Sequence, residues 1–567
     1  MLQASVQGLD TLTPIRNTGV NNVTANKLPA TQYAVQLIGP GELTLNASKP
    51  VPTPGPHEIL AKVEAVGLCF SDLKLLKQFD KHPRKTEIVG GVGPDILQAM
   101  QSYRPGGLPT VPGHEVVCRI VAVGDQVKHH QVGQRCLVQA DYRQLPTAAS
   151  SNAAFGYNLE GGLQEYTLFD ERVVIAPDGD RFLIPAGEDK SASAVALVEP
   201  WGCVEASYAT GERNTIKAGG KCLVVVAEGR QAQGVSESFS PDGPPAEVRN
   251  VSPGEVAALP AESFDDIVYF GSDKATLDVL NDKLAPRGIL NVVLGGRKIG
   301  QLVSVGVGRL HYGMTRWVGT TGNDASESYK RIPANGEVRA RDKILVVGAG
   351  GPMGEMHVIR NICSGLPGLR IVGTDLDDRR IAGLGRKAGP MAQANGVDLR
   401  LVNPQREPLD EKFTYFALMA PVGALIADAI QKAGEGAIIN IFAGIPAPTK
   451  HDLDIDAYVE KRAFMFGTSG STIEDMRIVL RKVESDQLDT NASVDAISGM
   501  AGATAGIAAV ENRIMAGKII VYPMLHDLGL IPLAELPQRF PSVAEKLDHG
   551  KWTREAEREL LQVAGGK

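Results

Sequence analysis

The sequence predicts an α/β protein in which a β-rich lobe precedes two tandem parallel-sheet units. Short alternating strands broken by Gly, Pro and Asn fill residues 33 to about 175, a pattern typical of a lobe made mainly of strands. Beyond this lobe, apolar strands alternate with helical segments, which indicates a parallel sheet. Residues 264–296 then resemble residues 413–445. These observations together predict the fold class.

The repeated stretch indicates a duplication of the α/β region. Each copy contains a strand, a helix, a glycine turn and a second strand with Asn four residues before Gly. Residues 317–328 repeat as 465–476 at nearly the same offset. Chance similarity is the alternative, because all parallel-sheet units look alike. The shared order and offset favour duplication.

The two copies open differently. The first begins "KCLVVVAEGRQAQG", where Glu228 and Arg230 flank the single Gly229. A phosphate-binding turn needs glycines so that the backbone can approach a pyrophosphate, and an acidic side chain would repel that group. The residues that follow are also too rich in Pro, Ser and Gly for a first helix. We therefore expect the first copy to be degenerate.

The second copy opens with "KILVVGAGGPMG", a strand, a glycine turn and a helix start. This order is typical of a Rossmann-like nucleotide-binding unit, in which the pyrophosphate lies at the helix N-terminus. The expected cofactor-binding residues of the turn are Gly348, Gly350, Gly351, Pro352, Met353 and Gly354.

The choice of nucleotide depends on Asp375, which ends the second strand of this copy. An acidic group there hydrogen-bonds the ribose hydroxyls and repels a 2′-phosphate. NAD is therefore favoured over NADP, although Arg379 and Arg380 nearby act in the other direction. We include Arg380 in the expected cofactor site. The alternative for Asp375 is an ordinary helix N-cap.

Three short motifs carry the residues of a candidate metal site. They are "GLCFSD" (67–72), "PGHEVV" (112–117) and "LVEPWGC" (197–203). A thiolate, an imidazole and carboxylates form a zinc-binding set, and a catalytic zinc uses three protein ligands plus water. Each residue alone is ambiguous, because a single buried Cys or His is usually structural. The candidate set is Cys69, His114, Glu115 and Glu199.

The order of these motifs resembles the zinc-dependent medium-chain dehydrogenase/reductase superfamily. The resemblance rests on "GLCFSD", on "GHE" followed by "VAVG", on "GGLQEY" and on "EP". It implies a GroES-like catalytic lobe followed by Rossmann-like units. Within the superfamily, "GAGGPMG", "INIFAG" and "GKIIVYP" are most similar to polyol dehydrogenases and to the L-sorbose-1-phosphate reductase type.

The resemblance assigns roles to residues of the metal site. Cys69 and His114 match zinc ligands, and Glu115 matches the adjacent carboxylate, which ligates directly or through water. Glu199 matches a carboxylate placed near the metal in polyol-type members. The lobe has no cysteine where relatives carry a four-cysteine structural zinc site. One catalytic zinc and no structural zinc are therefore expected.

Two further residues belong to the expected proton path. Ser71 stands where the family has a hydroxyl that relays the substrate proton, and Lys74 stands where it has a relay histidine. The expected activity is hydride transfer between NAD(H) and a secondary alcohol or ketone of a polyol, sugar or sugar phosphate. The alternatives are a reductase of another carbonyl compound and a non-catalytic zinc- and nucleotide-binding protein.

Composition narrows the class of partner. The chain of 567 residues has a net charge of −7 and no basic block, so nucleic acid and anionic membranes are not expected partners. The sequence contains no run of about 18 apolar residues and no apparent signal peptide. The six cysteines show no CxxC spacing, which fits a reducing cytoplasm. By resemblance, a homo-oligomer (dimer or tetramer) that acts on a small molecule is expected.

Five segments are predicted, and one insertion stands apart from them. Residues 77–107 form a polar interruption of the lobe, interpreted as a surface excursion with a substrate-facing role as the alternative. The predicted segments are an N-terminal arm (1–32), the GroES-like catalytic domain (33–195), the degenerate Rossmann-like unit (196–340), the NAD-binding Rossmann domain (341–485) and a C-terminal segment that returns to the catalytic domain (486–567).

Overall fold

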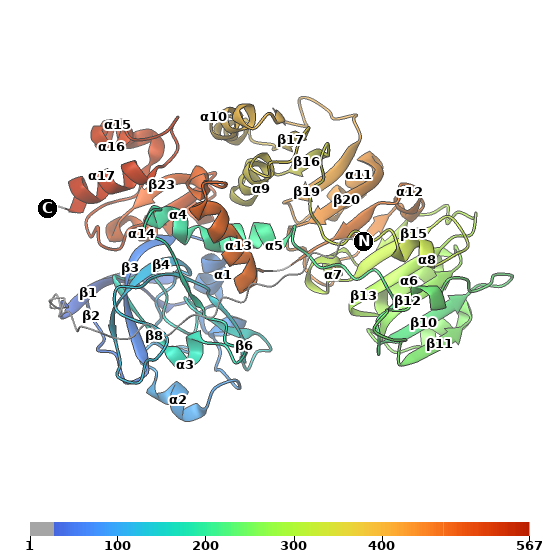
Figure 1. The fold of residues 1–567 in the computed structure, drawn as a ribbon, viewed down its shortest axis with the longest axis horizontal. Coiled ribbons are helices and arrows are strands. Elements are labelled where there is room, and N and C mark those ends of the chain that lie inside the picture. The colour runs from blue at the N-terminus through green and yellow to red at the C-terminus, as the bar shows by residue number, and fades with distance from the viewer. Residues whose placement is uncertain (1–27, 469, 566–567) are drawn as a thin grey trace, which may run out of the picture.

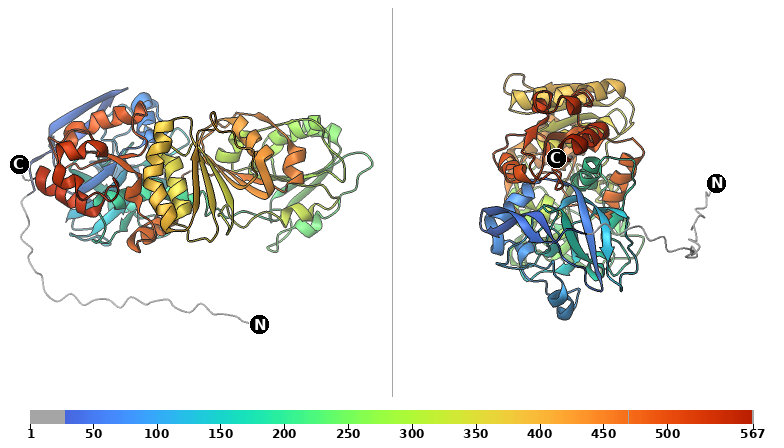
Figure 2. Two further views of the ribbon diagram at one scale, coloured as in Figure 1. Left: turned by 90° about the horizontal axis from the view of Figure 1, so that it is seen from above. Right: turned by 90° about the vertical axis from the view of Figure 1, so that its left-hand side faces the viewer.

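A computed structural model describes residues 28–468 and 470–565. Three bodies follow one another along the long axis of the molecule (Figures 1 and 2). The β-rich lobe and the C-terminal segment lie at one end, the second parallel-sheet unit lies in the middle, and the first unit lies at the other end. The predicted fold class is confirmed.

The lobe is built on an eight-stranded sheet in the order β25-β23-β24-β3-β4-β5-β9, with β8 paired to β3. Strand β24 pairs antiparallel with β3, so the C-terminal segment completes the sheet of the lobe. The strands are β3 (Glu58–Gly67), β4 (Glu115–Val123), β5 (Arg135–Val138), β8 (Tyr166–Asp170), β9 (Leu183–Pro185), β23 (Val494–Ser498), β24 (Lys518–Val521) and β25 (Ile531–Pro532).

Shorter elements surround this sheet. Residues 171–174, placed by the sequence among the strands, form helix α3, because the Asp170 side chain accepts a hydrogen bond from Arg172 N. The remaining elements of the lobe are β1 (Thr31–Gly39), β2 (Glu42–Pro50), β6 (Asp141–Pro146), β7 (Asn152–Ala154), α1 (Phe70–Gln78), η1 (Phe79–Lys81), η2 (Pro83–Lys85), α2 (Pro94–Ala99), α3 (Glu171–Val174), α4 (Ala192–Ala196) and α5 (Val198–Ala206).

The insertion at residues 77–107 is a packed part of the lobe. It lies against the β6–β7 hairpin, where Thr147 Oγ1 donates to Pro83 O over 2.9 Å. Lys85 is 0% exposed, and its ammonium donates to the carbonyls of Arg104, Gly106 and Leu108. A buried charge requires such partners. The Lys85 ammonium therefore holds the insertion in one conformation.

The C-terminal segment is mainly helical outside its strands. The segment contains η5 (Thr490–Ser493), α14 (Met500–Glu511), η6 (Leu533–Glu535), α15 (Leu536–Arg539), α16 (Pro541–Ala544) and α17 (Arg554–Gly565).

The first unit is a five-stranded parallel sheet in the order β11-β10-β12-β13-β15. Between β10 and β11, a stretch described in full, the one helical element is the 3-10 turn η3. The elements are β10 (Lys221–Val226), η3 (Ser236–Ser238), β11 (Glu247–Val251), η4 (Pro253–Ala258), β12 (Phe264–Phe270), α6 (Lys274–Lys283), β13 (Leu284–Val293), β14 (Val303–Val305), α7 (Val307–Tyr312), β15 (Arg316–Thr320) and α8 (Ser326–Tyr329).

The second unit has a six-stranded parallel sheet in the order β18-β17-β16-β19-β20-β22, the strand order of a Rossmann fold. Its elements are β16 (Lys343–Val347), α9 (Pro352–Ile362), β17 (Arg370–Thr374), α10 (Asp378–Ala394), β18 (Asp398–Val402), β19 (Phe413–Leu418), α11 (Gly423–Lys432), β20 (Ala433–Ile441), β21 (His451–Leu453), α12 (Ile455–Glu460), β22 (Phe464–Phe466) and α13 (Ile473–Glu484).

The second unit packs against the lobe. Helix α9 contacts α5, and Arg360 on α9 pairs with Glu205 on α5 over 3.1 Å. Toward the other end of the molecule, the sheets of the two units share one hydrophobic core. Helix α9, which follows the glycine turn, therefore lies against the lobe, in keeping with the middle position of the second unit in Figure 2.

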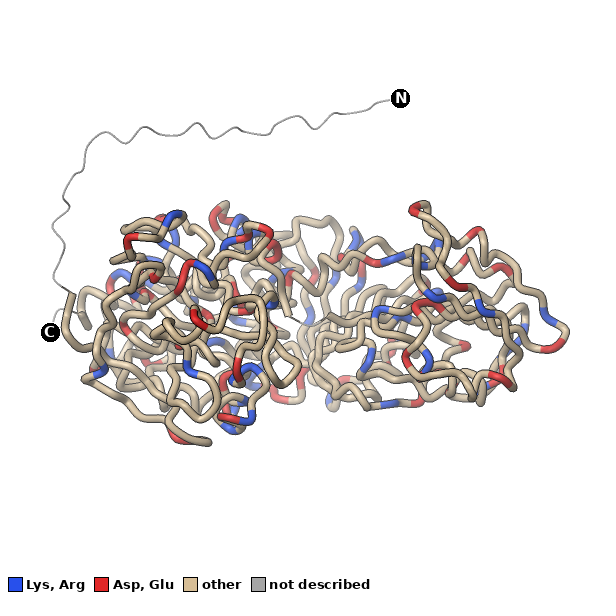
Figure 3. The backbone as a smooth tube through the Cα atoms, turned by 90° about the horizontal axis from the view of Figure 1, so that it is seen from below, with Lys and Arg blue, Asp and Glu red and all other residues tan. Residues whose placement is uncertain are grey.

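Charged residues of both signs alternate along the whole molecule (Figure 3). Among the residues that the structure describes, we find no helix with the length and apolar character of a membrane span.

Candidate metal and nucleotide sites

Pairing of β3 with β4 brings the candidate metal ligands together. Gly67, the last residue of β3, lies opposite Glu115, the first residue of β4. Cys69 then begins α1 as its N-cap, and His114 directly precedes β4. One ligand atom from each of Cys69, His114 and Glu115 lies within 4.8 Å of the other two. The structure thus assembles three of the four predicted ligands.

Ser71 and Asp72 complete the surroundings of these ligands. Ser71 Oγ lies 3.1 Å from Cys69 Sγ and 3.1 Å from His114 Nε2. Asp72 accepts from Cys69 N over 3.1 Å, and its other oxygen lies 3.0 Å from His114 Nδ1. A carboxylate on the far nitrogen of a ligating His fixes the tautomer and the ring orientation. Asp72 therefore aims His114 Nε2 at the cluster.

The electrostatic setting of His114 follows from this contact. Burial acts to lower the pKa of His114, but the charge of Asp72, aided by Tyr157, raises that pKa well above its usual value. The His114 and Tyr157 rings are 5.9 Å apart between centroids. The Asp72 carboxylate therefore favours a hydrogen on His114 Nδ1, the ring nitrogen that faces it.

Glu115 is held by a residue from the other end of the chain. The Lys518 ammonium, on β24, donates to Glu115 Oε1. The second oxygen, Oε2, is buried and has no hydrogen-bond partner within the described chain. A Cβ on Gly67 would lie 2.1 Å from this oxygen, so only glycine fits there. An unpartnered buried carboxylate oxygen beside a thiol and an imidazole fits a bound cation.

Glu199 lies outside the three-atom cluster but close to it. Burial raises the pKa of Glu199 to about 7; the charge of Glu115 adds to this effect, and His114 and Lys518 oppose it. Cys203 follows one turn later on α5, and burial together with the charge of Glu199 raises the pKa of its thiol. Glu199 is thus within electrostatic reach of the cluster as a further carboxylate.

Lys74 lies on the exposed side of α1, one turn after Ser71. Its charge contributes to the lowered pKa of His82, which falls to about 4 mainly through burial and then through Arg84. Lys74 is therefore exposed, and its charge reaches the buried His82.

The glycine turn of the second unit has the conformation that a nucleotide site requires. Gly348 has φ of 83°, a left-handed conformation that glycine adopts without strain. A Cβ on Gly354 would lie 2.1 Å from Gly348 O, so the turn and α9 pack closely. Gly351 is the N-cap of α9, and Pro352 and Met353 begin the helix. Its first N–H groups are available to a phosphate.

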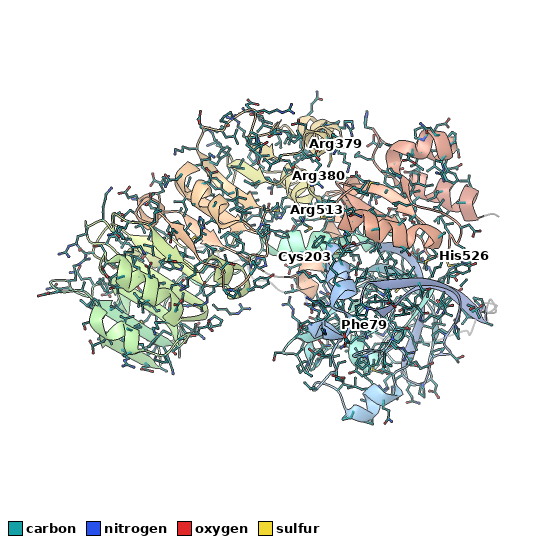
Figure 4. The ribbon with its side chains drawn as sticks, turned by 180° about the vertical axis from the view of Figure 1, so that it is seen from behind. Phe79, Cys203, Arg379, Arg380, Arg513 and His526 are labelled. Carbon is teal, nitrogen blue, oxygen red and sulfur yellow. The ribbon has the colours of Figure 1, made fainter. Side chains whose placement is uncertain are left out.

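The Asp375 side chain contacts this turn directly. One oxygen accepts from Gly350 N over 3.0 Å, and the other accepts from Asp377 N over 3.0 Å. The N-cap of α10 is Asp377, so the alternative reading of Asp375 as that cap does not hold. Arg380 donates to Arg513 O over 3.0 Å. Figure 4 shows Arg379, Arg380 and Arg513 grouped between the second unit and the C-terminal segment.

The equivalent place in the first unit is filled by protein. Arg230 follows β10, and its guanidinium donates to Leu294 O over 2.7 Å and to Val293 O over 3.2 Å. These carbonyls lie at the carboxyl end of β13, where an open unit would bind its ligand. A Cβ on Gly295 would collide with Arg230. The first unit therefore has only the turn η3 between β10 and β11, and the Arg230 side chain lies at the carboxyl end of its sheet.

Sequence reasoning missed Asp72 and Lys518. Asp72 lies within "GLCFSD" at the third helical position, where its capping-box contact with Cys69 could have been inferred. Lys518 lies in "GKIIVYP", which was noted for its resemblance only. Its contact with Glu115 joins residues 403 positions apart, and no local pattern predicts such a pair.

The comparison with known protein families gives the class of the lobe. Residues 55–178 match the alcohol dehydrogenase GroES-like domain. This match contains the Cys69, His114 and Glu115 cluster. The relatives described next are alcohol, sorbitol and threonine dehydrogenases, so the chain is similar in part to that class of oxidoreductase.

Individual relatives match between a fifth and about a quarter of the chain. Alcohol dehydrogenase notN of Aspergillus sp. (strain MF297-2) is 31% identical over 161 residues, 26% of this chain and 38% of the relative. Sorbitol dehydrogenase of Ovis aries is 32% identical over 113 residues, 20% of this chain and 26% of the relative. L-threonine 3-dehydrogenase of Xanthomonas euvesicatoria pv. vesicatoria (strain 85-10) is 28% identical over 162 residues, which are 27% of this chain and 39% of the relative. The chain thus spans about a quarter to two-fifths of their lengths.

Among solved structures, 2R,3R-butanediol dehydrogenase from Bacillus subtilis superposes with a TM-score of 0.49 at 13% identity, covering 87% of this chain and 100% of that chain.

Proposed function

We propose that this chain is a zinc-dependent oxidoreductase that transfers hydride between NAD(H) and a secondary alcohol or ketone of a polyol, sugar or sugar phosphate. The observation that carries the proposal is the cluster of Cys69, His114 and Glu115, in which a buried carboxylate oxygen lacks a partner among the described residues. The cluster lies in the part of the chain that matches the alcohol dehydrogenase GroES-like domain.

The donor set fits zinc. Cys69, His114 and Glu115 offer one thiolate, one imidazole and one carboxylate, the ligand types that zinc binds. Glu199 is the further carboxylate, and a single catalytic zinc is proposed. When bound, zinc acts as a Lewis acid and lowers the pKa of a coordinated alcohol. Carboxylate ligands also suit a substrate with neighbouring hydroxyls.

The residues of the lobe have defined tasks in this proposal. Asp72 orients His114, and Lys518 orients Glu115. Ser71 lies within 3.1 Å of both Cys69 Sγ and His114 Nε2, where its hydroxyl can take the proton of the substrate alcohol. Lys74, one turn further along α1, extends this path toward solvent.

The nicotinamide cofactor is assigned to the second unit, with its pyrophosphate at the Gly348–Gly354 turn. The Asp375 carboxylate would repel a 2′-phosphate, which favours NAD. Arg379, Arg380 and Arg513 instead line a cavity of about 780 Å³ beside the turn. Parallel titrations with NADH and NADPH test the assignment. Tighter binding of NADPH that is lost in Arg380→Ala would reverse it.

Substrate class is proposed from the metal site and from the similarity to sorbitol dehydrogenases. A screen over polyols, cyclitols, sugars and their phosphates, with NAD and NADP in parallel, tests it. Cys69→Ser is expected to remove bound zinc, measured by elemental analysis, and to reduce activity to background. Cys363→Ser, on the second unit, is the matched control and should change neither. A fully active Cys69→Ser variant would refute the proposal.

A further inference from the structure

The two α/β units face each other across an internal two-fold axis. Helices α6 and α11 begin 149 residues apart, and strands β14 and β21 begin 148 residues apart. β14 and β21 pair antiparallel, Val303 with Leu453, Ser304 with Asp452 and Val305 with His451. At an offset of 148 residues, Val303 is equivalent to His451 and Val305 to Leu453, and each of these residues pairs with the other's equivalent. Ser304 in the middle pairs with its own equivalent, Asp452. This reciprocity is the mark of an isologous interface.

The packing around the axis repeats on both sides. A Cβ on Gly467 would meet His311 Cα at 2.8 Å and Ile441 O at 3.0 Å. At the equivalent position, a Cβ on Gly319 would meet Val459 at 2.6 Å and Val292 O at 2.8 Å. Helix α7 of the first unit therefore lies at the carboxyl end of β20, and α12 of the second unit lies at the carboxyl end of β13. Each unit covers the ligand-binding edge of the other.

The two sides differ in chemistry where they cover these edges. Helix α12 of the second unit, which faces the first unit, presents Val459, an apolar side chain that is 3% exposed. The side that faces the open second unit presents His311 and, next to it, Tyr312, which is 48% exposed. The rings of His311 and Tyr312 pack edge-to-face, 4.7 Å apart. The two sides thus differ most at the buried position, which is His311 on α7 and the apolar Val459 on α12. At the exposed position, the aromatic hydroxyl of Tyr312 stands where α12 has the carboxylate of Glu460.

The geometry leaves the outer atoms of both side chains free for a ligand. His311 Nδ1 lies 3.2 Å from Ile441 O, so Nδ1 carries the hydrogen and Nε2 is an acceptor. Tyr312 Oη points over Gly444, 2.7 Å from where a Cβ would stand. Burial lowers the pKa of His311 and the charge of Lys74 on the lobe adds to this effect, so α1 lies within electrostatic reach of His311.

We propose that the first unit is an internal partner of the second, and that its helix α7 supplies His311 and Tyr312 to bind hydroxyl groups at the end of the substrate remote from the metal. The inference rests on the proposed function. It gives the degenerate copy a role in substrate specificity without any bound nucleotide. It also implies that a homo-oligomer of this chain uses another surface, because the β14–β21 edge is already paired.

Steady-state kinetics on the zinc-loaded full chain tests the inference. The substrates are the best five- or six-carbon polyol from the screen and the short butane-2,3-diol. Tyr312→Phe and His311→Asn should each raise KM for the long substrate roughly 3- to 10-fold. They should leave kcat and the KM for the diol within a factor of about 2. The Asn amide keeps the bond to Ile441 O and removes the outer acceptor.

Two further variants separate a binding role from a structural one. His311→Gln places an amide oxygen near the position of Nε2 and should restore most of the lost affinity. Glu460→Gln changes the residue equivalent to Tyr312 on the opposite side and should leave both KM values unchanged. Equal KM values in the wild type, Tyr312→Phe and His311→Asn would overturn the inference while the proposed function stands.

A wild-type chain that turns over none of the substrates would instead refute the proposed function. In that case, calorimetric titration of the zinc- and NADH-loaded protein with sorbitol gives the second readout. Weaker sorbitol binding in Tyr312→Phe would still support the inference, and unchanged binding or none at all would overturn it.

Discussion

From β12 and β19 onward, the two α/β units have equivalent strands and helices, yet the carboxyl edges of their sheets are occupied differently. In the second unit, the Gly348–Gly354 turn leads into the N-terminus of the 11-residue helix α9. In the first unit, the Arg230 guanidinium occupies the corresponding space and only η3 replaces the helix. The sheet of the first unit persists because it shares a hydrophobic core with the second. Loss of a ligand site and loss of a fold are therefore separate events here.

The largest expected effect comes from closing the turn of the second unit. Gly354→Val places a side chain against Gly348 O, which a Cβ would approach to 2.1 Å. The displaced turn should weaken NADH binding, measured by calorimetry, by at least about 100-fold. Gly229→Asn in the first unit tests the other copy, since its φ of 72° suits Asn and no atom would crowd the new Cβ.

Gly229→Asn should leave NADH binding within a factor of about 2, because the first unit is expected to bind no nucleotide. The opposite pattern, in which Gly229→Asn weakens binding and Gly354→Val does not, would transfer the cofactor site to the first unit. Far-ultraviolet circular dichroism of both variants checks that each remains folded.

The next largest effect concerns the interface between the copies. A Cβ on Gly308 would lie 2.0 Å from Pro446 O, and Gly308 N donates to Thr449 O over 3.1 Å. Gly308→Val should destabilise the docked first unit by about 2–4 kcal/mol, since the backbone must move apart. Urea unfolding with limited proteolysis measures this effect.

The control for Gly308→Val is Gly254→Ala, an exposed position of the first unit where a Cβ would meet nothing within 4 Å. It should change the unfolding free energy by less than about 0.5 kcal/mol. Equal stability of the two variants would show that the close approach at Gly308 is not needed for docking.

A third difference between the copies concerns a buried acid. Asp266 on β12 is fully buried, whereas the equivalent residue of β19 is Tyr415. Burial raises the pKa of Asp266 to about 6, although Arg213 acts to lower it. The folded protein then binds a proton more tightly than the unfolded chain does. The stabilisation is complete below the usual pKa near 4 and is lost as the pH rises through 6.

Replacing this acid removes the corresponding pH dependence. Compared with the wild type, Asp266→Asn should flatten the change in the free energy of unfolding between pH 4 and pH 7 by on the order of 1–3 kcal/mol. Urea midpoints at several pH values give the comparison. A variant that keeps the wild-type slope would show that Asp266 is ionised at pH 4.

The sequence predicted most of the fold because its signals are local. The strand–turn–helix pattern at Gly348–Gly354 and the repeats at 264–296 and 413–445 lie within short stretches. The order of motifs predicted the metal ligands by resemblance, and the pairing of β3 with β4 that brings them together is a finding of the structure. The Glu115–Lys518 contact and the reciprocal β14–β21 pairing join distant residues through side-chain packing and register. Such features depend on the whole fold.

The smallest effect tests whether Arg230 alone keeps the first unit closed. Arg230→Gly removes the hydrogen bonds to Val293 O and Leu294 O and should destabilise the first unit by about 1–2 kcal/mol. It should not create nucleotide binding, because Glu228 remains and no helix N-terminus follows β10. The decisive measurement uses the double variant Arg230→Gly/Gly354→Val. Because the second unit of this variant is expected to bind no NADH, any binding that remains must come from the first unit. NADH binding that appears in this double variant would show that the first copy is blocked only by one side chain, and its continued absence supports loss of both the helix and the turn.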